Sequence, residues 1–161
     1  MRGTRQQPGG FTLIELFVVV AIAGVLAAFA VPAISAMAQQ RAARAEVAKV
    51  KATLEVARDA ARAQLRCRHV TRQTPTSLQV EELESSSSSC GTTVLTTTVT
   101  QYSASLIDIT SAIDFTFDRT GGLAGVTDAY LDFTVAEKRP GAADVPQTLR
   151  VFRVLGLVRR L

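Results

Sequence analysis

The chain has 161 residues, of which 47% are hydrophobic and 6% aromatic, and this length fits one domain of ordinary size. The formal net charge of +4 is unevenly spread: residues 41–66 hold seven basic and three acidic side chains, whereas residues 67–161 hold nine basic and ten acidic ones. The overall basicity therefore does not by itself indicate a nucleic-acid partner for the nearly neutral C-terminal part.

A long apolar segment follows a short basic leader. Residues 1–10 contain Arg2 and Arg5 and no acid, and Leu16–Ala38 is apolar except for one glycine, one proline and one serine. About 20 apolar residues are enough to span a bilayer as a helix, and basic residues favour the cytoplasmic side. The sequence predicts a single-pass transmembrane helix over residues 11–40, with a cytoplasmic N-terminus and the remainder exported.

The helix is expected to continue, so that one rod runs from Phe11 to about Arg66. Apolar residues recur at spacings of three and four over residues 41–66, which predicts an amphipathic helix. The expected buried stripe consists of Val47, Val50, Leu54, Ala57, Ala61 and Leu65.

Two further features of the rod follow from its sequence. We expect three ion pairs on the exposed face, namely Lys51 with Glu55, Glu55 with Arg58, and Asp59 with Arg62. Gly24 and Pro32 are the weak points of the apolar half. Pro32 removes one backbone hydrogen bond and is expected to kink the helix.

Beyond the helix the apolar period changes to two, which indicates β-strands. The expected strands are SLQVEEL, TTVLTTTVT, YSASLIDI, AIDFTF, AYLDFTVA and TLRVFRVLGLVRRL, with ESSSSSCG as a loop and DRTGG and KRPGAADVP as turns. The predicted fold class is therefore α+β: a long N-terminal helix packed on an antiparallel sheet or sandwich formed by residues 67–161.

Two cysteines, Cys67 and Cys90, lie in the part that is expected to be exported. An oxidising compartment lets such residues pair, and a disulfide is the expected outcome. The alternative is two inert buried thiols.

One carboxylate, Glu15, stands at the head of the apolar segment. A carboxylate inside hydrocarbon costs about 2.5 to 3.5 kcal/mol, so it usually has a partner. The stretch Gly9-Gly10-Phe11-Thr12-Leu13-Ile14-Glu15, followed by the apolar segment and Pro32, resembles the N-terminal signature of type IV pilins and of type II secretion pseudopilins.

The resemblance implies that a prepilin peptidase cuts between Gly10 and Phe11 and that the new terminus at Phe11 is N-methylated. It also implies an inner-membrane precursor that later joins a filament of pilin-like subunits. The freed amine would lie close to Glu15 and favour its ionised form, and an ion pair between subunits would set their register. Glu15 is thus predicted to be an assembly residue.

The C-terminal part is similar to minor subunits of the GspH/FimT type, through IDFTFDRTGG and TLRVFRVLGLVRRL. Some FimT-like subunits take part in DNA uptake, and four arginines lie near this end: Arg150, Arg153, Arg159 and Arg160. Arginines can neutralise phosphates and bind DNA without sequence preference. The alternative is a solvated edge strand whose charges prevent aggregation.

Other function classes have weaker support in the sequence. Ala28-Phe29-Ala30 fits an ordinary signal-peptidase site, which would release a soluble protein starting at Val31. His69 lies two residues from Cys67 without further metal ligands nearby, and we find no catalytic set and no cofactor motif. Neither an enzyme nor a metal protein is predicted.

Overall fold

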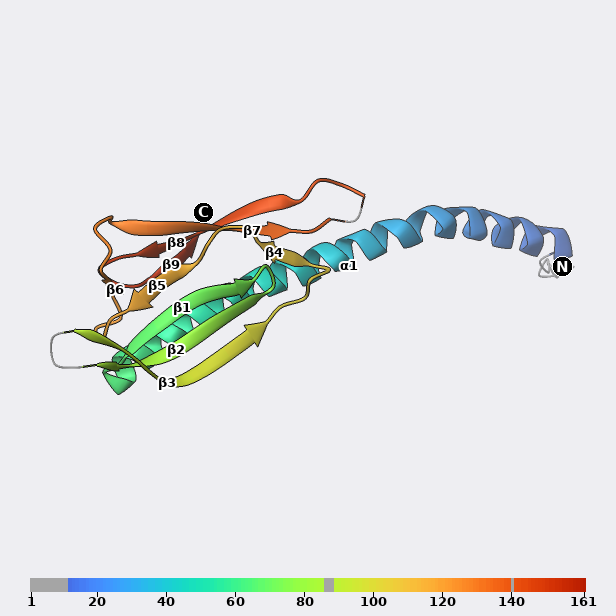
Figure 1. Cartoon of the computed structure of the whole chain (residues 1–161). Helices are drawn as coiled ribbons and strands as arrows, with labels where there is room; N and C mark the ends of the chain where they lie inside the picture. The colour runs from blue at the N-terminus through green and yellow to red at the C-terminus, as the bar shows by residue number, and fades with distance from the viewer. Residues whose placement is uncertain (1–11, 86–88, 140) are drawn as a thin grey trace, which may run out of the picture. The chain divides into compact units, whose positions relative to one another are not determined.

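The computed structural model describes residues 12–85, 89–139 and 141–161, without the side chains of residues 29–33. The chain divides into two compact units, Met1–Ala38 and Gln39–Leu161. The described residues form one helix and nine strands, and all the strands lie in the second unit (Figure 1). In chain order these are α1 (Leu13–Gln64), β1 (Cys67–Thr74), β2 (Ser77–Ser85), β3 (Cys90–Gln101), β4 (Ile107–Ile109), β5 (Asp114–Phe117), β6 (Leu123–Ala124), β7 (Tyr130–Glu137), β8 (Val145–Phe152) and β9 (Val158–Arg160).

The strands form two sheets in which every pair is antiparallel. The first sheet has the order β3-β2-β1-β5-β6, and the second has the order β4-β7-β8-β9. The C-terminal half of α1 runs along the sheets (Figure 1). The predicted α+β, pilin-like fold, with a long N-terminal helix packed on antiparallel sheets, is confirmed.

The core of the second unit is built on the predicted apolar stripe of α1. Five of its six expected members are at most 4% exposed: Val47, Val50, Leu54, Ala57 and Ala61. They join one cluster with residues of both sheets, including Phe117 of the first and Leu149 of the second. The helix is therefore the element through which the two sheets share a single core.

Leu65 was wrongly predicted to close this stripe, because it is 63% exposed. The helix ends at Gln64, and Leu65 has a left-handed backbone with a φ of 53°. The amide of Arg66 donates a hydrogen bond to the carbonyl of Ala61 at 3.1 Å, which completes a Schellman C-cap. The reversal of the chain takes the Leu65 side chain off the helical stripe.

Only one of the three expected ion pairs on α1 is confirmed, that of Lys51 with Glu55 at 3.6 Å. Asp59 pairs instead with its neighbour Arg58 at 2.7 Å, so the pairs that involved Arg58 and Arg62 were wrong. Both arginine stems serve in packing. A Cβ placed on Gly121 would lie 2.5 Å from Cδ of Arg62, which shows how closely the helix approaches that turn.

β1 is a central strand that the sequence analysis did not predict, since its sequence CRHVTRQT is mostly polar. Each of its charged side chains has a partner on a neighbouring element. Arg68 meets Glu82 at 2.8 Å, His69 meets Asp114 at 2.8 Å, and Arg72 donates to the carbonyl of Ile109 at 2.6 Å. Polar residues are tolerated in this strand because neighbouring elements satisfy them.

In the first unit α1 continues without a break through Pro32. The kink that was predicted there stays a prediction. The expected bounds of the rod, Phe11 to Arg66, are close to the observed Leu13–Gln64. Over the described residues, no helical stretch combines the length and the hydropathy needed to cross a membrane.

The turn between β8 and β9 supports a first prediction, on Gly156. Its φ is 58°, and a Cβ there would lie 1.9 Å from the carbonyl oxygen of Gly121 and 2.8 Å from Cδ of Arg58. Gly156→Ala should therefore lower the free energy of unfolding by at least about 3 kcal/mol. Gly125→Ala is the matched control, because Gly125 also has a positive φ but open space around it, and should cost about 1 kcal/mol. Urea denaturation that gave equal losses would contradict the close contact.

A second prediction concerns Tyr102, which is 6% exposed and donates to Oγ1 of Thr53 at 2.9 Å. Burial raises the pKa of Tyr102 to about 12; the bond to Thr53 opposes this rise and the charge of Glu46 adds to it. Between pH 10 and 12 the unfolded chain releases this proton while the folded chain keeps it, so the free energy of unfolding should fall by about 2 kcal/mol as pH rises. Urea denaturation between pH 10 and 12 should show little of that fall in the Tyr102→Phe variant. The Tyr130→Phe variant should show the same fall as wild type.

Candidate assembly and contact sites

The first turn of α1 is capped by Thr12. Its side-chain oxygen accepts a hydrogen bond from the amide of Glu15 at 3.3 Å, and its carbonyl accepts from the amide of Leu16 at 3.2 Å. Glu15 thus occupies the third position of the helix, where a carboxylate is favoured by the helix dipole. The sequence analysis missed this role of Thr12, although Thr-x-x-Glu before an apolar run is the signal of a capping box.

The carboxylate of Glu15 is exposed, and within the described residues it meets no basic side chain. Capping explains why an acid is tolerated at this position, but it leaves the charge without a cationic partner in the described part of the chain. The predicted partner is the amine of Phe11. Gly10 and Phe11 lie outside the described residues, so the predicted cleavage and methylation sites are not tested.

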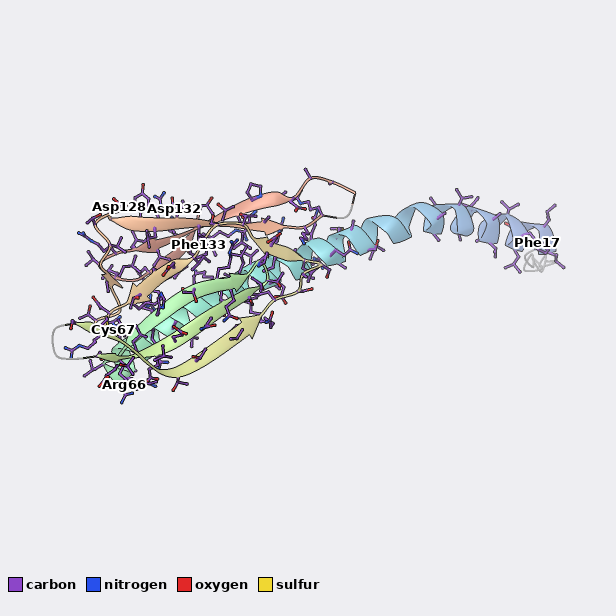
Figure 2. The ribbon with its side chains drawn as sticks, viewed as in Figure 1. Phe17, Arg66, Cys67, Asp128, Asp132 and Phe133 are labelled. Carbon is purple, nitrogen blue, oxygen red and sulfur yellow. A yellow bond between two sulfur atoms is a disulfide. The ribbon has the colours of Figure 1, made fainter. Side chains whose placement is uncertain are left out.

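The apolar side chains of the first unit are exposed in the described residues. Phe17, which Figure 2 labels near the N-terminal end of α1, is 67% exposed, and Leu13 and Ile14 are each 72% exposed. The exposed fraction stays above half at the large apolar residues Ile22, Leu26 and Met37. This half of the helix thus presents an apolar surface that nothing in the described chain covers.

Comparison with known families locates a motif in this same region. Residues 5–31 match the prokaryotic N-terminal methylation motif. This motif is typical of type IV pilins and pseudopilins, which are generally structural proteins and not enzymes. No curated protein and no solved structure matches the chain. The chain therefore combines a methylation motif typical of type IV pilins and pseudopilins with a pilin-like α+β fold, while the GspH/FimT subtype is not confirmed.

Of the four C-terminal arginines, Arg150 is the most firmly bound within the chain. It donates two hydrogen bonds of 2.8 Å to the carboxylate of Asp132 and stacks on Tyr130, 3.6 Å from the ring centre. These hydrogen bonds lower the pKa of Asp132 below its ordinary value. Figure 2 places Asp132 on the outer side of β7, opposite the buried Phe133.

The other three arginines differ in how far they are engaged. Arg153 donates to the carbonyl of Thr127 at 2.9 Å, and Arg160 donates to Gln147 at 2.7 Å and to the buried Glu137 at 3.3 Å. Arg159 lies exposed on β9, which is an edge strand. This position is the one expected if the arginines form a solvated edge. Internal partners thus compensate much of the predicted basic cluster, and DNA binding stays an untested prediction.

The remaining candidate residues have structural partners. Cys67 and Cys90 form the predicted disulfide, with a Cα–Cα distance of 5.6 Å, and the alternative of inert thiols was wrong. His69 lies between Asp114, at 2.8 Å, and Glu81, at 3.5 Å, on opposite ring nitrogens. Among the described residues no His, Cys, Asp and Glu cluster is suited to hold a metal ion.

The DRTGG segment is the predicted turn. The carboxylate of Asp118 accepts hydrogen bonds from the amide and hydroxyl of Thr120 and from the amide of Gly122, at 2.6 to 3.0 Å. Partial burial opposes ionisation of Asp118, but these bonds outweigh it and hold its pKa below the ordinary value. Its carboxylate oxygen is therefore used to fix the turn between β5 and β6.

The disulfide generates the third prediction. It joins the start of β1 to the start of β3 across a sequence separation of 23 residues, and closing such a loop stabilises the folded state by about 3 kcal/mol. The double substitution Cys67→Ala, Cys90→Ala should lower the free energy of unfolding by about this amount in urea denaturation. Reduced wild type keeps both sulfur atoms in place and serves as the control for the lost volume. Equal stability of oxidised and reduced protein would contradict the prediction.

Proposed function

We propose that the chain is the precursor of a minor, pilin-like structural subunit that assembles into a type II secretion pseudopilus or a type IV pilus through its N-terminal helix. The observation that carries this proposal is the methylation motif at residues 5–31, which continues into α1. The pilin-like fold of helix and antiparallel sheets supports it. The minor-subunit role rests on the resemblance of the C-terminal sequence to GspH/FimT subunits.

The exposed apolar half of α1 explains why such a subunit needs partners. A helix that is apolar on all sides is stable in lipid or among similar helices and is unfavourable in water. In the proposal, the motif directs the precursor to the inner membrane, with its N-terminus in the cytoplasm and its β-rich domain in the periplasm. Filament assembly then exchanges the lipid around the helix for the helices of neighbouring subunits.

Processing supplies the cation that Glu15 lacks. Cleavage between Gly10 and Phe11 by a prepilin peptidase leaves a positive amine, methylated on Phe11, four residues before the first-turn carboxylate of a capped helix. Attraction between this amine and Glu15 of an adjacent subunit costs little additional ordering, because Thr12 already fixes the turn. Such a pair would define the axial register of the subunits.

The fourth prediction tests this function at its two steps. Mass spectrometry of the mature protein should find an N-methylated Phe11 as the first residue; a terminus at Val31 would indicate a secreted soluble protein instead. Glu15→Gln should leave processing unchanged but reduce incorporation into filaments at least about tenfold, because glutamine retains capping ability at this position and loses only the charge.

The matched control is Glu55→Gln, which neutralises a half-exposed carboxylate of the same helix in the second unit, where it pairs with Lys51. Incorporation is measured by cross-linking of the subunit into sheared filaments. Wild-type incorporation of the Glu15→Gln protein would rule out the ion pair, and failure of Glu55→Gln would show that the loss is not specific to position 15.

A further inference from the structure

A small pocket, here called the Gln39 pocket, lies where the second unit begins along α1. It measures about 220 Å³ and is lined by Gln39, Ser105, Leu106 and Lys138. Gln39 is the first residue of the second unit and directly follows the apolar segment of the sequence. The other three residues come from the loop before β4 and from the chain just after β7. All four lining residues therefore belong to the second unit, and one of them adjoins the end of the apolar segment.

The polar groups of the Gln39 pocket can donate hydrogen bonds. The ammonium of Lys138 gives one of its three hydrogens to the carbonyl of Ala104 at 2.8 Å, which leaves two available. The hydroxyl of Ser105 meets that of Ser103 at 3.0 Å, and its own hydrogen is free when Ser103 donates. The side-chain amide of Gln39 supplies further donors. Since no carboxylate is among the described residues that line the pocket, these groups suit an anionic phosphate.

Two arginines of α1 follow Gln39 within five positions of the sequence. Arg41 and Arg44 are exposed, and neither has an ion pair or a hydrogen bond with a described part of the chain. The nearest acid of the helix, Glu46, is engaged with Lys49 at 3.8 Å. The positive charge of both arginines is thus left without a carboxylate partner in the described structure.

The chain after β7 adds two more cations. Lys138 has no carboxylate partner among the described residues. The Nε atom of Arg139 is buried and has no hydrogen-bond partner there. The preceding residue Glu137 does not compensate these cations, because it is buried and pairs with Arg160 at 3.3 Å.

The charge of this end of the second unit favours an anionic surface. Two acids that are not engaged in ion pairs, Asp108 and Asp144, stand against the four cations and leave a net charge of +2. In the proposed function the preceding apolar segment lies in lipid, so the first residues after it lie at the level of the headgroups. A cation near an anionic membrane surface strengthens binding about fivefold. DNA fits less well, because the membrane occupies this place in the precursor.

We propose that the Gln39 pocket, together with Arg41 and Arg44, binds the headgroup of an anionic phospholipid such as phosphatidylglycerol. Lys138, Ser105 and Gln39 donate to its phosphate, and the two arginines contact neighbouring headgroups. This inference rests on the proposed function, because a headgroup adjoins the pocket only when the apolar segment lies in lipid. The bound lipid holds the β-rich domain at the membrane surface until assembly withdraws the helix.

The test uses the full, unprocessed chain in micelles of a neutral detergent, with equal amounts of phosphatidylglycerol and phosphatidylcholine added. Both lipids carry the same acyl chains and a phosphate, and they differ in net charge. Native mass spectrometry should find at least about fivefold more bound phosphatidylglycerol than phosphatidylcholine. Addition of phosphatidylglycerol should also slow hydrogen exchange in residues 103–107 and leave residues 118–122 unchanged.

Matched variants test the location. Lys138→Gln should lower phosphatidylglycerol binding about fivefold, and Lys138→Arg, which keeps the charge, should retain it. Arg159→Gln is the control, because it removes one exposed charge from β9 and should bind as wild type. The double variant Arg41→Gln, Arg44→Gln should lower binding at least about fivefold, and the exposure of both side chains makes a folding defect unexpected.

The proposal fails if the two lipids bind equally or if Lys138→Gln and Arg159→Gln behave alike. It also fails if inorganic phosphate at the same concentration displaces phosphatidylglycerol, because the pocket then takes a free anion. Displacement by a DNA duplex would overturn it as well, since the occupant would then be a nucleic acid. None of these measurements needs cleavage at Gly10 or filament assembly, so failure of lipid binding and failure of the proposed function are told apart.

Discussion

The fold depends on one stripe of five small and aliphatic residues on α1, from Val47 to Ala61. Both sheets contribute side chains to the cluster that buries this stripe, so neither sheet has a complete core without the helix. The small size of Ala57 and Ala61 lets the backbone of α1 approach the sheets closely. The same closeness requires Gly121 and Gly156 where the turns meet the stems of Arg58 and Arg62.

Periodicity made much of this predictable. The spacing of three and four over residues 41–66 indicated the buried face of α1, and alternation indicated most strands of the domain. Periodicity could not find β1, because a central strand with Arg68, His69 and Arg72 is tolerable only once Glu82, Asp114 and the carbonyl of Ile109 are in place. Those partners come from segments distant in sequence, which no local pattern reveals.

The candidate sites divide in the same way. A short local motif sufficed to mark the region around Glu15. The disulfide was predicted because both cysteines lie in the part of the chain that was expected to be exported. The arginine cluster shows the opposite case. Four cations near one end suggested an anion site, but Asp132 and Glu137 of β7 pair with two of them and so reduce the net positive charge of this surface. Net charge along a sequence is thus a poor guide to the charge that a surface presents.

β3 is fastened near both of its ends. Cys90 is bonded covalently to Cys67, the carbonyl of Gln101 is held by Lys49, and the next amide, that of Tyr102, donates to Thr76 at 2.8 Å. A strand held at two ends has already lost most of its conformational freedom. Reduction of the disulfide would therefore also free the Cys90 end of β3 from the start of β1.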